Sequence, residues 1–198
     1  HEGLVCLNCH VDRDMVPHQP AATPFAPGSE GCRACHEQES ADYQRHGRAA
    51  LGKSEDLPRC SSCHGGHDVL PSSLQLSKTH PSNLPATCGS CHEDVKLTAK
   101  YDILIATPVK IYSTSVHGRA TKGGVFVAAT CSDCHSTGGS AHKIFGPGDA
   151  TSTISFQNIP ATCGKCHKGI ETEYRQGIHG RRAAQGETDS PVCTTCHG

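Results

Sequence analysis

The sequence predicts a chain that is mostly irregular, with short α-helices and almost no sheet. Hydrophobic residues occupy 35% of its 198 positions and aromatic residues 4%, so side chains offer little material for a core. The 21 glycines and 12 prolines also interrupt regular structure. Such a chain leans towards disorder unless another apolar group fills its interior. The cysteines indicate which group that is.

All fourteen cysteines lie in seven Cys-x-x-Cys-His motifs, the attachment pattern of c-type haem. Each thiol adds across one vinyl group of the porphyrin, and the two-residue spacer places both sulfurs at one edge of the ring. The histidine that follows becomes an axial ligand of the iron. Structural zinc sites also use Cys-x-x-Cys pairs, but they do not require a histidine after every second cysteine. We therefore expect seven covalently bound haem c groups, whose rings form the core.

The motifs assign the attachment residues, and we number the haems 1 to 7 in chain order. The predicted thioether cysteines are Cys6, Cys9, Cys32, Cys35, Cys60, Cys63, Cys88, Cys91, Cys131, Cys134, Cys163, Cys166, Cys193 and Cys196. The predicted proximal iron ligands are His10, His36, His64, His92, His135, His167 and His197.

The motifs alternate between two types. Type B motifs are the second, fourth and sixth, and two of them are nearly identical: NLPATCGSCH (Asn83–His92) and NIPATCGKCH (Asn158–His167). Type A motifs are the first, third, fifth and seventh, and the last three follow a His-Gly-Arg fourteen residues before the first cysteine. We expect one heptahaem domain over residues 1–198. It would consist of three and a half two-haem repeats, at about 1–45, 46–116, 117–178 and 179–198.

Helices are expected between each type B motif and the next type A motif. The candidates Glu37–His46, Glu93–His117 and Lys168–His179 are rich in helix formers and are each followed by glycine. Because glycine commonly terminates a helix, each of these histidines is expected in a last helical turn. Pro108 is expected to kink or break the second candidate.

Two other residue types recur beside these histidines. An arginine follows each histidine by two positions, and two interpretations stay open: pairing with a haem propionate, or simple solvation after a helix end. A tyrosine precedes each histidine by three or five positions and is a candidate for packing on a ring. The residues concerned are Arg48, Arg119, Arg181, Tyr43, Tyr112 and Tyr174.

Each iron needs a second axial ligand. Met15 is the only methionine, so we expect bis-histidine ligation throughout, with low potentials relative to Met/His cytochromes. Eight histidines lie outside the motifs, and six of them recur with the repeat: three in His-Gly-Arg triplets and three after type A motifs. The eight are His1, His18, His46, His67, His80, His117, His142 and His179.

Adjacency along the chain assigns the six recurring histidines. The members of the His-Gly-Arg triplets serve the haem that follows: His46 serves haem 3, His117 haem 5 and His179 haem 7. The histidines after type A motifs serve the next type B haem: His18 serves haem 2, His67 haem 4 and His142 haem 6. For haem 1 we favour His80 over His1, which is only five residues from Cys6. A histidine of another subunit is the remaining alternative.

The alternating pattern, with helix ends such as Ser115–Gly118, resembles periplasmic and extracellular multihaem electron-transfer cytochromes, including those that stack into filaments. The resemblance covers the whole chain. An iron with two protein ligands has no open position for a substrate, so we expect an electron carrier and not an enzyme. The alternative is a multihaem reductase of the nitrite or hydroxylamine type, in which haem 1 keeps an open position.

The resemblance also bears on location and partners. We expect an exported periplasmic or extracellular protein whose signal peptide has been removed, since the chain begins at His1. Redox proteins or extracellular acceptors are the expected partners. A net charge of −1 gives no indication of nucleic acid binding, and no apolar run could span a membrane. A monomer and a filament of identical subunits, joined from haem 7 to haem 1, both stay open.

Overall fold

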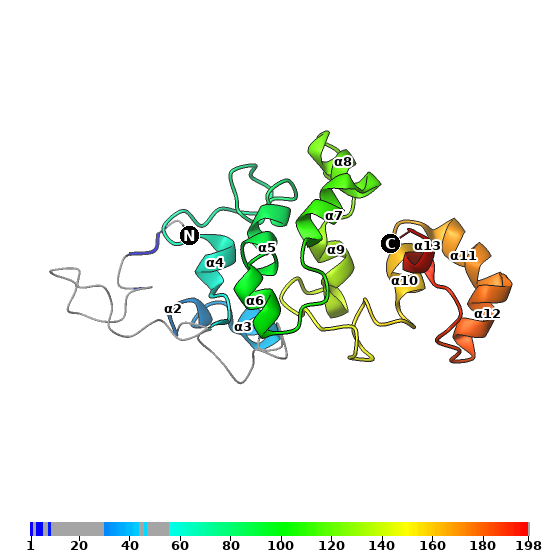
Figure 1. The fold of residues 1–198 in the computed structure, drawn as a ribbon. Helices are drawn as coiled ribbons and strands as arrows, with labels where there is room; N and C mark the ends of the chain where they lie inside the picture. Colours follow the sequence, from blue (N-terminus) through cyan, green and yellow to red (C-terminus); the bar gives the residue numbers. More distant parts are fainter. Residues whose placement is uncertain (2, 6–7, 9–29, 44–45, 47–55, 198) are drawn as a thin grey trace. The chain divides into compact units, whose positions relative to one another are not determined.

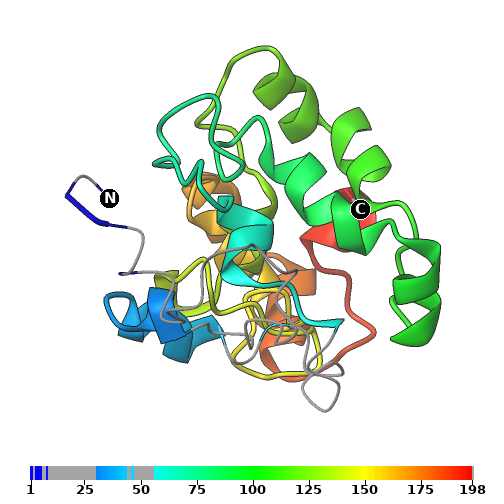
Figure 2. The ribbon, with the colours of Figure 1, turned by 90° about the vertical axis from the view of Figure 1, so that its left-hand side faces the viewer.

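The computed structural model describes residues 1, 3–5, 8, 30–43, 46 and 56–197, and they form short helices joined by irregular segments (Figures 1 and 2). The helices are α2 (Glu30–Arg33), α3 (Glu37–Tyr43), α4 (Cys60–His64), α5 (Leu84–His92), α6 (Val95–Lys100), α7 (Pro108–Thr114), α8 (Val116–Lys122), α9 (Cys131–His135), the 3₁₀ helix η3 (Thr137–Gly139), α10 (Ile159–Gly164), α11 (Lys168–Gln176), α12 (Ile178–Ala184) and α13 (Cys193–His197). The described residues contain no β-strand, and one isolated bridge pairs Ser136 with Ile144. The predicted mixture of short helices and irregular chain is confirmed.

The chain divides into two compact units. The first consists of His1–Gln44 and Ala49–Cys131, and the second of Arg45–Arg48 and Ser132–Gly198. In the first unit, α7 packs against α5 and α8, and α5 also contacts α4 and α6. In the second unit, α11 packs against α10 and α12, and α10 contacts α13. The prediction of one heptahaem domain concerns the haem-loaded protein and stays a prediction.

Hydrophobic side chains build almost no core in the described residues. Only Phe145, Ala183 and Val192 are buried there, fewer than the buried polar and charged residues. Large apolar side chains are instead exposed, with Leu104 at 95% and Val127 at 90%. Since burial of apolar surface is the main force that stabilises a fold, the polypeptide alone leaves that contribution largely unused.

The last two predicted long helices are each interrupted. Ser115 is extended between α7 and α8 (φ −70°, ψ 166°), and Gly177 has nearly the same geometry between α11 and α12 (φ −73°, ψ 168°). His117 and His179 therefore lie in the first turn of a helix. The prediction that they end a helix is wrong for both. In the first copy α3 ends at Tyr43, so His46 lies beyond it.

Glycine follows these histidines for a reason other than helix termination. Gly118 lies inside α8, where its N–H donates to Ser115 Oγ at 3.1 Å and so completes the cap of that helix. A Cβ there would lie 2.0 Å from the carbonyl oxygen of Tyr112, at the end of α7. The glycine thus allows two helices to meet closely. Pro108 starts α7, as proline often starts a helix, and the predicted break is confirmed.

The type B repeat is visible in the hydrogen bonds as well as in the sequence. The side-chain amide of Asn83 donates to the carbonyl of Ser77 at 2.8 Å. In the next copy, the amide of Asn158 donates to the carbonyl of Ser152 at the same distance. Each amide also donates to a second carbonyl, that of Gln75 for Asn83 and that of Ala150 for Asn158. The two copies therefore fold the segment before their motifs alike.

Candidate haem-attachment sites

Each motif that the structure describes forms one helical turn. Helices α4, α9 and α13 are the third, fifth and seventh motifs, and α5 ends with the fourth. In the second motif the N–H of His36 donates to the carbonyl of Cys32 at 2.9 Å, and in the sixth His167 donates to Cys163 at 2.9 Å. Residues three and four positions apart share one face of a helical turn, so both thiols and the histidine project on the same side.

This geometry fits the covalent attachment of haem. No disulfide bond joins the cysteines that the structure describes, and addition to a vinyl group requires cysteines in this form. The spacing puts the histidine of each turn on the same face as the two sulfurs, so it could bind the iron of a haem that they hold. Cys6, Cys9 and His10 of the first motif lie outside the described residues. The part of the chain that the structure covers holds no group of three or more His, Cys, Asp or Glu side chains arranged for a metal ion.

Thiols of successive motifs are neighbours in the first unit. Burial raises the pKa of Cys63, and the nearby Cys91 thiol adds a smaller effect. A thiol of the third motif therefore lies near a thiol of the fourth. A hydrogen bond with Cys131, together with burial, raises the pKa of Cys88. A thiol of the fourth motif therefore lies near a thiol of the fifth. Burial also lowers the pKa of His92 and so favours the neutral imidazole, the form that binds a metal.

The second unit repeats this relationship. Burial and the neighbouring Cys193 thiol raise the pKa of Cys163 to about 11, and Cys134 adds a smaller effect. Cys134 belongs to the fifth motif, Cys163 to the sixth and Cys193 to the seventh. Within the first unit, sulfurs of the third, fourth and fifth motifs are therefore neighbours in chain order, and within the second unit the same holds for sulfurs of the fifth, sixth and seventh motifs.

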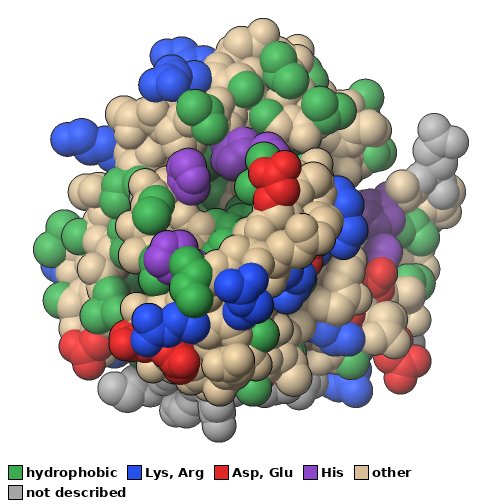
Figure 3. All heavy atoms as spheres, turned by 90° about the vertical axis from the view of Figure 1, so that its right-hand side faces the viewer, with side chains coloured by type: hydrophobic (Ala, Val, Ile, Leu, Met, Phe, Trp, Pro, Cys, Tyr) green, Lys and Arg blue, Asp and Glu red, His purple; other side chains and the backbone are tan. Residues whose placement is uncertain are grey.

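The predicted distal histidines differ in exposure. Those described are buried (His80), half-buried (His46, His117 and His142) or exposed (His67 and His179). His18 lies outside the described residues. Figure 3 shows histidine side chains at the surface among hydrophobic ones on one face.

His80 has a defined environment. Its side chain belongs to a residue that is 5% exposed, and its Nδ1 lies 2.7 Å from Ser82 Oγ and accepts the Ser82 N–H at 3.2 Å. The ring packs edge-on against Phe126, with the two centroids 4.8 Å apart. Ser155 takes this place in the later copy, and its buried hydroxyl has no hydrogen-bond partner. The competing candidate, His1, is exposed, and its ring lies 5.9 Å from that of His36.

Three tyrosines bind the chain just before type A motifs, a contact that sequence reasoning missed. Each phenol donates to the carbonyl two residues before the first cysteine of the motif: Tyr43 to Pro58, Tyr112 to Ala129 and Tyr174 to Pro191. The tyrosines recur in the sequence, but nothing local indicates an acceptor fifteen or seventeen residues away. Burial raises the pKa of Tyr43, and the nearby Cys63 and Cys60 thiols add to the effect.

The recurring arginines contact the preceding helix. Arg119 Nη1 donates to the carbonyl of Thr114 at 3.0 Å, and Arg181 donates to the carbonyl of Gln176. Both acceptors are the last residues of their helices, α7 and α11, where carbonyls lack partners within the helix. Arg48 lies outside the described residues. The pairing of these arginines with haem propionates stays a prediction.

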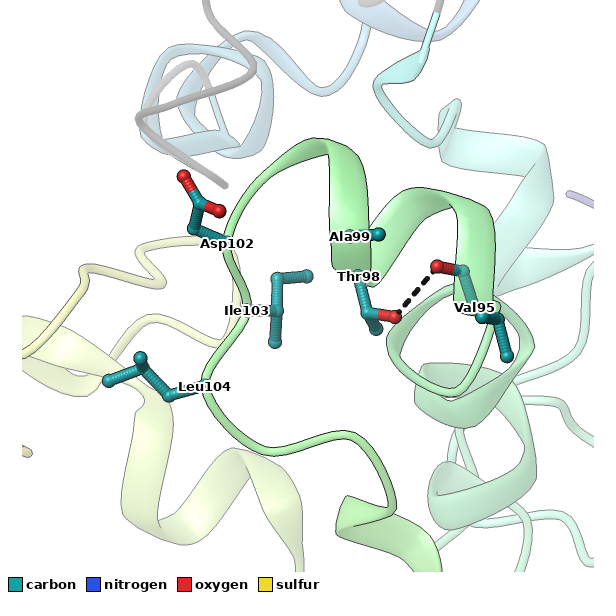
Figure 4. Close-up of a pocket in the computed structure, with 6 residues that line it drawn as sticks. All are labelled: Val95, Thr98, Ala99, Asp102, Ile103 and Leu104. Atoms are coloured by element: carbon teal, nitrogen blue, oxygen red, sulfur yellow. Dashed lines mark hydrogen bonds between the residues drawn. The ribbon is translucent and has the colours of Figure 1, made fainter.

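A pocket of about 350 Å³ lies beside α6 (Figure 4). Its lining is Val95, Thr98, Ala99, Asp102, Ile103 and Leu104. Thr98 is buried, and its hydroxyl donates to the carbonyl of Val95 at 3.2 Å. None of the predicted haem residues lines this pocket.

Comparisons with protein-family models, curated proteins and solved structures find no match for this chain. In the part of the chain that the structure describes, no helix is both long and apolar enough to cross a membrane. The functional conclusion therefore depends on the motifs and on their geometry.

Proposed function

We propose that the protein transfers electrons along a chain of seven covalently attached haem c groups. The observation that carries this proposal is the order of the motifs: each described motif is one helical turn, and within each of the two units the thiols of successive motifs are neighbours. Rings attached to neighbouring sulfurs would themselves be neighbours. A succession of close redox centres is what electron transfer along a protein requires.

The haem iron supplies a one-electron redox centre when it is bound. The two cysteines of each motif would bond the haem, and the histidine of the same turn would bind its iron. A histidine outside the motif would be the second ligand of the iron and would exclude small substrates from it. The protein is then a carrier and not an enzyme, with redox proteins or extracellular acceptors as its partners in the periplasm or outside the cell.

The distribution of apolar side chains supports the same proposal. Leu104, Val127, Leu76 and Val95 are all at least 79% exposed in the polypeptide. Haem rings would cover such side chains and provide the apolar burial that the polypeptide lacks. The fold is accordingly expected to depend on haem attachment.

Carbon monoxide binding distinguishes a carrier from a reductase. The reduced protein should bind almost no carbon monoxide under native conditions, because histidine pairs occupy every iron. Substantial binding at one haem per chain would instead favour a nitrite or hydroxylamine reductase with an open position.

The assembly is tested separately. The proposal admits a monomer and a filament in which haem 7 of one chain adjoins haem 1 of the next. Sizing and electron microscopy of the purified protein decide between them. A monodisperse monomer whose haem 1 is six-coordinate through its own chain would exclude the filament.

A further inference from the structure

Two contacts tie the backbone near His179 to the segment that leads into the seventh motif. The hydroxyl of Ser190 donates to the carbonyl of His179 at 2.9 Å. Ser190 is buried and lies three residues before Cys193. The phenol of Tyr174, in the helix that precedes His179, donates to the carbonyl of Pro191 at 3.1 Å. The predicted distal histidine and the predicted attachment cysteines of haem 7 are therefore joined through side-chain hydroxyls.

The first unit holds an equivalent arrangement around His117. The phenol of Tyr112 donates to the carbonyl of Ala129 at 3.0 Å and lies 2.9 Å from Thr121 Oγ1. The hydroxyl of Thr121 in turn donates to the carbonyl of His117 at 3.0 Å. The two hydroxyl groups have one proton each, so only two of these three contacts can be hydrogen bonds at any one time.

The two copies reach this result with different residues. Counting from the histidine, Thr121 corresponds to Ala183, and Ser190 corresponds to Ala128. Each copy thus lacks the hydroxyl that the other uses, yet each places one hydroxyl on the carbonyl of its histidine. The Thr121 bond spans four residues within α8, as hydroxyls in helices often do, whereas the Ser190 bond spans eleven residues and joins separate segments.

We propose that Ser190 and Tyr174 are positioning residues for His179, and that Thr121 and Tyr112 are positioning residues for His117. This inference rests on the proposed function. The hydroxyl contacts set where each imidazole lies relative to the ring held by Cys193 or Cys131. Residues that orient a metal ligand affect the strength of its bond to the metal although they do not touch the metal.

The test compares S190A, Y174F and the double variant with the wild-type protein. T172A is the matched control, because the Thr172 hydroxyl donates to the Lys168 carbonyl at 3.0 Å within α11 and links no histidine to a motif. H179A marks the complete loss of the ligand. Intact mass counts the haems, electron paramagnetic resonance reports each low-spin iron, and carbon monoxide binding reports an open iron.

Seven haems should be attached in the wild type, the single variants and T172A. Each single variant should shift the low-spin signal of one haem, and the double variant should bind carbon monoxide at up to one haem per chain. T172A should match the wild type. If the double variant assembles with fewer haems, the test rests on the single variants, each of which removes only one of the two links. Their low-spin signals and carbon monoxide binding are then compared with those of T172A.

Two outcomes would overturn the inference, and they differ. If S190A and Y174F keep seven haems and are indistinguishable from T172A, the positioning role is excluded while the proposed function stands. If the wild-type protein carries no covalent haem, the proposed function fails and the inference fails with it.

Discussion

A Cβ atom on Gly180 would lie 2.1 Å from the carbonyl oxygen of Tyr174. The same relationship joins Gly118 to Tyr112, at 2.0 Å. In both copies the glycine follows a predicted distal histidine, and the tyrosine belongs to the helix before it. This close approach holds the histidine against the end of the preceding helix, while the tyrosine side chain reaches the segment before the motif.

Gly180→Ala should therefore destabilise the protein. The added Cβ meets backbone atoms, which cannot swing away as a flexible side chain can, so α12 must shift relative to α11. We expect a loss of about 1–3 kcal/mol in the free energy of unfolding, measured by chemical denaturation. Gly169→Ala is the control, because a Cβ there meets nothing within 4 Å. It lies in α11, where alanine is favoured over glycine by about 0.5–1 kcal/mol. Equal effects of the two substitutions would contradict the packing argument.

Asn158→Ala should also be destabilising. Its amide donates to the carbonyls of Ala150 and Ser152, at 2.9 and 2.8 Å, and both acceptors lose this partner on substitution. A loss of about 1–3 kcal/mol is expected from thermal or chemical unfolding. Gln157→Ala removes an exposed amide next to it in the chain and should leave stability nearly unchanged. The expectation is wrong if the two variants unfold alike.

Stability should depend on pH through Glu171. Its buried carboxylate lies 3.0 Å from Lys168 Nζ and 2.8 Å from Arg175 Nη2, and the hydrogen bonds from these cations hold the pKa of Glu171 below its ordinary value of 4.5. Because this pKa is lowered in the folded state, the stabilisation is complete above that ordinary value. It is lost as the pH falls through the folded-state pKa.

Glu171→Gln should then lower the melting temperature at neutral pH, and the difference from wild type should narrow as the pH falls below 4.5. Glu173→Gln is the control, since Glu173 lies in the same helix but is exposed. A gap between wild type and Glu171→Gln that does not change with pH would show that packing, and not the charge, is responsible.

The ligand of haem 1 is tested by comparing His80→Ala with His1→Ala. His80 is buried and its Nδ1 lies against Ser82, an arrangement that fixes the ring, whereas His1 is exposed. His80→Ala should convert one haem to the high-spin state, and His1→Ala should leave all haems low-spin. Electron paramagnetic resonance of the two variants decides, and the reverse result would transfer the assignment to His1.

The attachment turns could be predicted from the sequence because their geometry is local. A spacing such as that from Cys60 to His64 places three side chains on one helical face, whatever surrounds them. The scarcity of buried apolar side chains could also be predicted, since composition limits what a chain can bury. The short helices and the absence of strands in the described residues followed from the same reasoning.

The helix ends could not be predicted correctly, because they depend on contacts between helices. A glycine after a helical pattern has the local signature of a terminator, and Gly118 and Gly180 carry that signature. What determines their identity is the carbonyl of an adjacent helix. The same holds for the tyrosine phenols, whose acceptors lie fifteen or seventeen residues further along the chain.

Covalent haem content tests the account most directly. Intact mass of the protein, purified after expression with haem attachment and measured under denaturing and reducing conditions, gives the number of groups that remain bonded to the chain. The account predicts the polypeptide mass plus seven haems, with an absorption spectrum of low-spin haem c in the native protein. A mass equal to that of the polypeptide alone, or one with fewer than seven haems, would contradict it.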